Sequence, residues 1–173
     1  ADRLYQMGGA QAVAALAYGT ESVRPVEKIV GPGNRFVTAA KAAVQGDVAI
    51  DFRAGASELL AVVDETADPE AVAADMLAQA EHDPDASVVT VATSEAVARA
   101  VREAVVDRLP AQPRSETIEA ALSGAQSAVL VADSIEAATD FAEAYAAEHL
   151  SIQTADDEAV LANIDSAGSV FLG

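Results

Sequence analysis

The sequence contains no cysteine, and only two of its 173 residues are histidine. Without cysteine the chain can form neither a disulfide nor a thiolate metal site, so a metal ion would have to be held by histidine, carboxylate or carbonyl ligands. The lack of cysteine also fits a cytoplasmic protein, which is the location that we expect.

Long apolar runs and lysines are scarce as well. No run approaches the roughly 18 apolar residues that indicate a membrane span. The only lysines are Lys28 and Lys41, and 28 acidic residues stand against 10 basic ones, which gives a net charge of −18. Such a charge repels nucleic acid and anionic membranes, so we expect neither as a partner. An acidic, lysine-poor surface is typical of adaptation to high salt, and we expect a salt-adapted (halophilic) protein.

Strands and helices are predicted to alternate along the chain. Apolar periodicity and turn signals indicate helices over 3–17, 36–44, 68–82, 94–108, 115–122, 134–146 and 156–164. They indicate strands over 28–30, 48–52, 59–63, 87–91, 129–131, 150–153 and 169–172. This order is typical of α/β proteins with open, mainly parallel sheets that carry helices on both faces. Two successive blocks are expected, over 1–57 and 58–173.

One candidate metal site lies at the end of the helix predicted over 68–82. Gln79 and His82 are three residues apart, so both project from one face of the last helical turn. A side-chain carbonyl and an imidazole on one face could share a metal ion. A histidine in the last turn is also favoured by the helix dipole when no ligand is present, and spacing alone favours this second interpretation.

The segment Lys28–Asn34 combines a short strand with a glycine-rich turn, Gly31-Pro32-Gly33-Asn34, before a helix. This arrangement can point backbone N–H groups at an anion. It is neither a G-x-G-x-x-G fingerprint nor a Walker loop, so taken alone it is more typical of a plain turn.

Glutamate precedes the second histidine, in the pair Glu148-His149, where a predicted helix gives way to a strand. Such a pair could divide base duties, with the histidine taking a proton from an alcohol and the glutamate activating water. A solvated glutamate beside a histidine in a turn is the simpler interpretation of these two residues alone.

Eight segments occur together in an order that resembles the central part of the histidinol dehydrogenase family. They cover almost the whole chain and are Gly8–Ala12, Gly19–Val23, Lys28–Asn34, Ile50-Asp51, Gly55–Glu58, Gln79–His82, Glu148–Leu150 and Ala167–Gly173. Each segment is weak evidence by itself, whereas the set is highly specific.

The resemblance implies an enzyme that uses zinc and NAD to oxidise L-histidinol, through the aldehyde, to L-histidine. Gln11 and Asn34 match residues that contact NAD, and Ser57 matches a serine that contacts the substrate. Gln79 and His82 match two zinc ligands that also lie against the substrate. Glu148 and His149 match the two acid/base residues, of which His149 also touches the substrate. The resemblance thus assigns a catalytic role to Glu148 and His149, whereas these two residues taken alone favoured a non-catalytic interpretation.

The same resemblance implies that the chain is an internal fragment. In the family, the remaining zinc ligands (an aspartate and a histidine) and a substrate-contacting glutamate match positions beyond Gly173, and an NAD-contacting tyrosine matches a position before Ala1. The C-terminal ligands come from the partner subunit of a homodimer. Residues 1–57 and 58–173 would be the second halves of two Rossmann-like domains. We expect the fragment alone to be inactive. Alanine stands at Ala56 and Ala147, where the family usually has proline.

Two alternatives remain open from the sequence. The first is a zinc- and NAD-dependent relative that acts on another small hydroxy substrate. The second is a non-catalytic α/β module, which composition and periodicity allow but which gives no reason for the eight segments to occur together.

Overall fold

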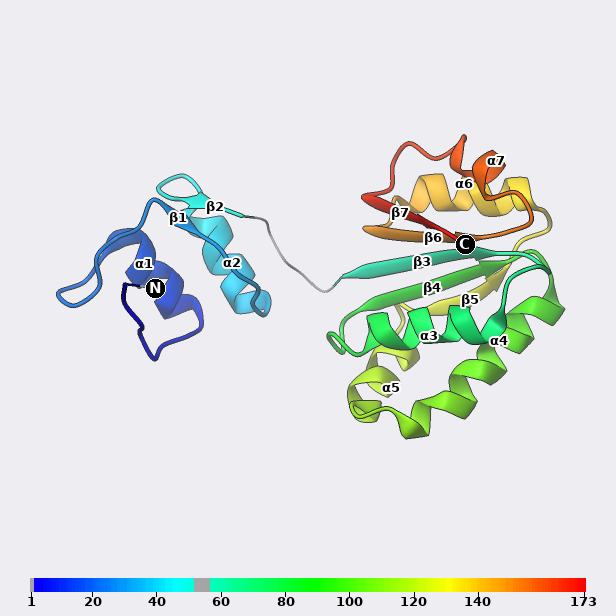
Figure 1. Cartoon of the computed structure of the whole chain (residues 1–173), viewed down its shortest axis with the longest axis horizontal. Coiled ribbons are helices and arrows are strands. Elements are labelled where there is room, and N and C mark those ends of the chain that lie inside the picture. Colours follow the sequence, from blue (N-terminus) through cyan, green and yellow to red (C-terminus); the bar gives the residue numbers. More distant parts are fainter. Residues whose placement is uncertain (1, 52–56) are drawn as a thin grey trace. The chain divides into compact units, whose positions relative to one another are not determined.

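The computed structural model describes residues 2–51 and 57–173, which belong to two compact units, Ala1–Gly55 and Ala56–Gly173 (Figure 1). Gly55 and Ala56, which belong to one of the eight segments, lie outside the described residues, as does the end of the strand predicted over 48–52.

The first unit contains two helices and a two-stranded parallel sheet. Its elements are α1 (Ala10–Tyr18), β1 (Lys28–Ile29), α2 (Arg35–Val44) and β2 (Ala49–Ile50). Its small core is made by Val13, Ile29, Val44 and Val48. The helix predicted over 3–17 is wrong at its start, because the backbone of Gly9 has a φ of 77° and α1 begins only after it.

The second unit is built on a five-stranded sheet in the order β5-β4-β3-β6-β7, and every pairing in it is parallel. The strands are β3 (Glu58–Val63), β4 (Ser87–Ala92), β5 (Ala128–Val131), β6 (His149–Gln153) and β7 (Ser169–Leu172). The chain moves outward from β3 to β5 and then returns to the other side of β3 for β6 and β7. The predicted parallel α/β architecture is confirmed.

Helices cover both faces of this sheet (Figure 1). On one face lie α3 (Pro69–Ala80), α4 (Glu95–Arg108), the short 3₁₀ helix η1 (Leu109–Ala111) and α5 (Ser115–Ser123), and on the other lie α6 (Ile135–Tyr145) and α7 (Asp157–Leu161). Along β3, Leu59, Ala61 and Val63 join the core under α3, whereas Leu60 and Val62 join the core under α6. This alternation is the two-residue period of a strand that is buried on both faces. Within the described part of the chain, no helix is both long enough and apolar enough to cross a membrane.

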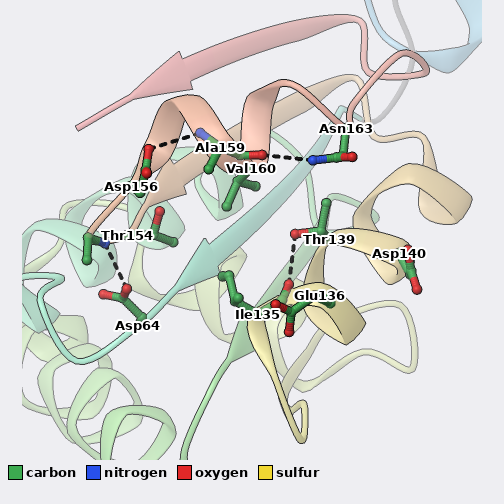
Figure 2. A pocket seen from close by; sticks show the side chains of 11 residues that line it. Asp64, Ile135, Glu136, Thr139, Asp140, Thr154, Asp156, Ala159, Val160 and Asn163 are labelled. Atoms are coloured by element: carbon green, nitrogen blue, oxygen red, sulfur yellow. Dashed lines mark hydrogen bonds between the residues drawn. The ribbon is translucent and has the colours of Figure 1, made fainter.

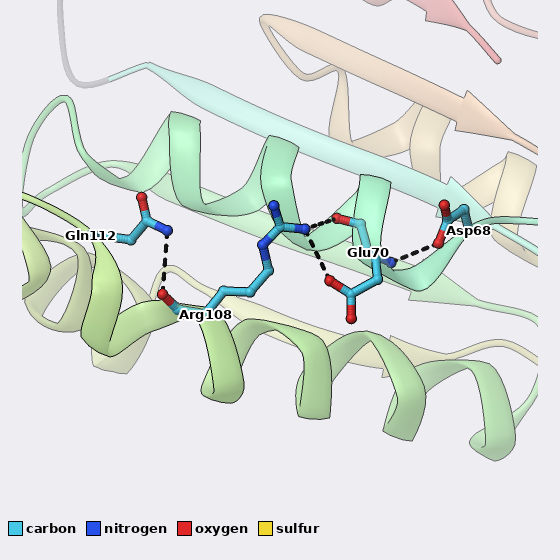
Figure 3. Close-up of polar contacts among 4 residues, drawn as sticks. All are labelled: Asp68, Glu70, Arg108 and Gln112. Carbon is cyan, nitrogen blue, oxygen red and sulfur yellow. Dashed lines mark hydrogen bonds and ion pairs between the residues drawn. The ribbon is translucent and has the colours of Figure 1, made fainter.

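The start of α3 is fixed to α4 by polar contacts (Figure 3). Asp68 caps α3 by accepting a hydrogen bond from the backbone N–H of Glu70, at 2.9 Å. From the end of α4, Arg108 donates to the backbone carbonyl of Glu70 at 2.9 Å and pairs with its carboxylate at 3.0 Å. The exposed ion pair adds little to stability, whereas the cap and the backbone contact define where α3 begins. Because α3 carries Gln79, these contacts also define the position of a predicted site residue.

Candidate functional site

A cavity of about 320 Å³ lies beside α3 and the strands β6 and β7, and it extends from the amino ends of β3 and β6 to Gly173, just after β7. Gln79, His82 and His149 all line it, so three of the residues singled out from the sequence lie at one site although they are up to 70 positions apart. Ser57 joins them through a short hydrogen bond that Gln79 donates to its hydroxyl. This convergence was not deducible from the local spacing of any one segment.

One stripe of α3 supplies the first half of the cavity lining. Asp75, Gln79 and His82 follow one another at intervals of four and three residues, which places them on one face of the helix and of the turn after it. Gln79 is buried, and its Nε2 atom is engaged by Ser57. The carbonyl oxygen Oε1 of Gln79 is therefore the atom that remains for a ligand.

The second half of the lining comes from the face of β6 that is turned towards α3. Leu150 and Ile152 pack into the core under α6, so His149, Ser151 and Gln153 lie on the opposite face. Gln153 is buried and donates from Nε2 to the hydroxyl of Ser151 at 3.2 Å. The α3–β6 interface therefore carries a row of polar side chains where a parallel sheet usually has apolar ones.

His149 is the first residue of β6 and is held in a partly apolar position. Its ring lies against that of Phe171, with ring centroids 6.1 Å apart. Its Nδ1 atom is buried and makes no hydrogen bond to any residue that the structure describes. A buried ring nitrogen without a partner is costly, and such atoms are typical of functional sites, where a substrate or water supplies the missing partner.

The backbone before His149 makes an unusual turn that sets the position of Glu148. Ala146 ends α6 in the left-handed conformation, with a φ of 55°, and Ala147 is buried. Gly168 packs so tightly here that an added Cβ atom would lie 2.8 Å from the carbonyl oxygen of Glu148. The side chain of Glu148 is exposed and does not line the cavity. The structure thus places His149 in the site and Glu148 next to it along the chain.

Four residues of this region were missed in the sequence: Asp75, Ser151, Gln153 and Phe171. Asp75 could have been found, because it precedes Gln79 by one helical turn. Ser151 and Gln153 could have been found from their even spacing after His149. Partial burial raises the pKa of Asp75 above the usual range of a carboxyl group. Phe171 gave no signal, because only strand pairing places it beside β6.

The donors in the cavity suit a zinc ion, although they form an incomplete set. Zinc accepts imidazole nitrogen and side-chain oxygen, and His82 and Gln79 offer one of each from neighbouring positions of one face. Zinc sites usually have three or four protein ligands, and the residues described here contain no group of three or more His, Asp or Glu side chains arranged around a metal. Gln79 and His82 could therefore supply part of a zinc site only together with ligands from elsewhere, and their assignment as zinc ligands stays a prediction.

The two residues matched to NAD contacts lie in the first unit, each at the start of a helix. Gln11 is exposed in the first turn of α1, which follows Gly9. Asn34 is exposed and caps α2, because its Oδ1 atom accepts from the backbone N–H groups of Phe36 and Val37. Neither helix has an acidic residue in its first turn, which favours an anionic ligand. Both side chains fit a polar contact to a nucleotide, and Asn34 would make it through its amide nitrogen.

A buried ion pair fixes the glycine-rich turn that carries Asn34. The Nζ atom of Lys41 lies 2.6 Å from the carboxylate of Asp51; the side chain of Lys41 is buried and that of Asp51 is 10% exposed. Lys41 also donates to the carbonyl of Gly31, while Asp51 accepts from the N–H of Gly31 at 2.8 Å. The predicted order of strand, glycine-rich turn and helix is confirmed, and both backbone groups at the start of the turn are tied to the ion pair.

A second cavity, of about 440 Å³, lies at the opposite, carboxyl edge of the larger sheet (Figure 2). Open α/β sheets usually bind ligands at this edge. Two of its acidic side chains are hydrogen-bonded to the neighbouring loops: Asp64 accepts from the backbone N–H of Ala155 at 2.7 Å, and Asp156 caps α7 through Ala159 at 3.0 Å. None of the residues singled out from the sequence lines this cavity.

Comparisons with known proteins identify relatives over the whole chain. The family model described as histidinol dehydrogenase matches residues 1–173. The chain is 66% identical to a histidinol dehydrogenase of Natronomonas pharaonis and 65% identical to one of Halobacterium salinarum, and each alignment covers all of this chain and 41% of the relative. A crystal structure of histidinol dehydrogenase from Elizabethkingia anophelis is 45% identical and superposes with a TM-score of 0.88, over 98% of this chain and 39% of the other. The chain thus spans about two fifths of the length of these relatives.

Proposed function

The chain belongs to the histidinol dehydrogenase family, and from this premise we propose that it forms part of an L-histidinol dehydrogenase. The proposed reaction is the oxidation of L-histidinol, through the aldehyde, to L-histidine with two molecules of NAD. The observation that carries the proposal is the meeting of Gln79, His82 and His149 in one cavity, with Ser57 bonded to Gln79. A non-catalytic module would not require these four side chains to converge.

We propose that Gln79 and His82 hold zinc together with ligands from elsewhere in the enzyme. When bound, zinc would supply a Lewis acid that holds the substrate nitrogens and fixes the alcohol carbon in place. Ser57 fixes the amide of Gln79, so the direction of the carbonyl ligand is set before a metal arrives. Ser57 is also a proposed contact for the substrate.

His149 is the proposed general base of the alcohol step. Its ring lines the cavity and is held by Phe171, so it can take the alcohol proton as hydride leaves for the nicotinamide. Glu148 is the proposed base that activates water for attack on the aldehyde. Its side chain is exposed and makes no hydrogen bond to the described residues, so it can turn towards the cavity without breaking one.

The first unit is the proposed NAD side of the enzyme, with Gln11 and Asn34 as contacts. We further propose that residues 1–57 and 58–173 are the second halves of two Rossmann-like domains, and that a homodimer in the cytoplasm completes the site. Neither nucleic acid nor a membrane is a proposed partner. The net charge of −18 supports adaptation of this enzyme to high salt.

The test is NADH formation from L-histidinol by a protein of full family length that carries this chain. Two NADH per histidinol are expected, with activity lost on chelation and restored by zinc. If a folded, zinc-loaded dimer forms no NADH from L-histidinol, the substrate assignment is wrong, and other small amino alcohols become the substrates to assay.

A further inference from the structure

Asp75 lines the same cavity as Gln79, His82 and His149, but nothing in the proposed reaction yet uses it. It lies one turn before Gln79 on the same face of α3. Among the described residues that line this cavity, Asp75 has the only acidic side chain.

The carboxylate of Asp75 is held by a buried partner. Gln153 donates from Nε2 to Oδ2 of Asp75 at 3.3 Å, and the same amide contacts Ser151. Gln153 and Ser151 are both buried on the face of β6 that carries His149. Burial of these polar groups costs free energy that apolar residues would not cost, which is typical of a functional site rather than of a packed core.

Only one oxygen of Asp75 is engaged by Gln153. The other oxygen, Oδ1, accepts no hydrogen bond from the described residues, and the carboxylate is partly removed from water. If Gln79 and His82 hold a metal, their carbonyl oxygen and imidazole nitrogen are engaged there, so a substrate nitrogen that keeps its proton calls for an additional acceptor. Such an N–H group needs an acceptor, and a carboxylate is the strongest acceptor that a side chain offers.

We propose that Asp75 is a further substrate-binding residue, whose Oδ1 atom accepts a hydrogen bond from a nitrogen-bound proton of the amino alcohol. The inference rests on the proposed function. It makes Asp75 a determinant of specificity for nitrogen-bearing substrates and makes Gln153 the residue that positions it. The nitrogen belongs either to the imidazole or to the amine, because both can donate a hydrogen bond from N–H to a carboxylate.

The test is equilibrium binding of L-histidinol without NAD, measured by calorimetry on the zinc-loaded protein of full family length. Asp75→Asn keeps the shape of the side chain but replaces a charge-assisted hydrogen bond by a neutral one, so the dissociation constant is expected to rise roughly tenfold. Gln153→Met, which removes the donor to Asp75, is expected to raise it by a smaller factor. Asp107→Asn, an exposed residue of α4, makes the same change of charge away from the cavity and should bind like the wild type.

Two analogues identify the nitrogen. If Asp75 binds the imidazole, Asp75→Asn should raise the dissociation constant of 4-(hydroxymethyl)imidazole by the same factor as that of L-histidinol. If Asp75 binds the amine, it should do so for L-leucinol.

An unchanged dissociation constant for L-histidinol in Asp75→Asn would overturn the proposal. A loss of zinc content together with affinity would overturn it as well, because Asp75 would then act through the metal. Failure of the wild-type protein to bind L-histidinol would instead refute the proposed function.

Discussion

Replacement of Gly168 by alanine tests how the backbone around Glu148 is held. Gly168 does not have a positive φ, so alanine can adopt its conformation, and the only obstacle is space. The added Cβ atom would lie 2.8 Å from the carbonyl oxygen of Glu148 and 3.4 Å from its Cα atom. Both neighbours are backbone atoms of the residue just before β6, so neither can rotate away as the end of a side chain would.

The expected cost follows from two opposing effects. Overpacking that forces a shift of the backbone typically costs about 1–3 kcal/mol. The shift would also stretch the hydrogen bonds from Gly168 N–H to Ala147 at 3.0 Å and from Ser169 N–H to Glu148 at 2.9 Å. Alanine lowers the conformational entropy of the unfolded chain relative to glycine, which stabilises the folded state by roughly 0.4–1 kcal/mol. We therefore expect Gly168→Ala to lower the free energy of unfolding of the second unit by about 1–2 kcal/mol.

Urea unfolding followed by far-UV circular dichroism measures this change, and amide hydrogen exchange of β6 locates it in the second unit. Ser169→Ala is the matched control, because it removes an exposed hydroxyl next to Gly168 and keeps the backbone bonds. The control should lie within about 0.5 kcal/mol of the wild type. A Gly168→Ala variant as stable as this control would show that the close approach of Gly168 to Glu148 does not constrain the backbone before β6.

Three further results are expected. Lys41→Met removes the ammonium group that lies 2.6 Å from the largely buried carboxylate of Asp51 and should destabilise the first unit by roughly 3–5 kcal/mol in hydrogen exchange, with recovery when Asp51→Leu is added; no loss would contradict the role of the pair. Because salt screens a net charge of −18, the melting temperature should rise between low and molar KCl, and an unchanged value would count against salt adaptation. In the full-length enzyme, Glu148→Gln should slow oxidation of the aldehyde more than that of the alcohol in single-turnover measurements, whereas equal slowing would refute its assignment to the water step.

Most of the architecture was predictable because the local signals agree with the tertiary structure. Asp68, Ser94 and Ser134 were expected to open helices, and each accepts a hydrogen bond from the first turn of its helix. The apolar run predicted over 59–63 lies in the central strand β3, where burial on both faces removes the need for alternation. The start of the first helix was not predictable from apolar spacing, because two consecutive glycines override it.

The contacts within the candidate site were less predictable than its residues. Gln79 and His82 share a helix face, which spacing alone reveals, whereas their approach to His149 depends on the return of the chain to the other side of β3. Strand order is a non-local property, and no short segment encodes it. Local spacing could have placed Asp75 and Gln153 on the faces that carry Gln79 and His149, but not the hydrogen bond between them, which joins residues 78 positions apart.

The alternation along β6 links correct strand pairing to a functional site. A slip of one residue in its register against β3 would turn His149, Ser151 and Gln153 into the apolar core under α6 and would leave Leu150 and Ile152 facing the cavity. A chain with this error would remove polar side chains from the candidate site and would bury three polar groups in the same event. Misfolded molecules would therefore be both inactive and unstable, so a selection for activity alone would also select for the correct register.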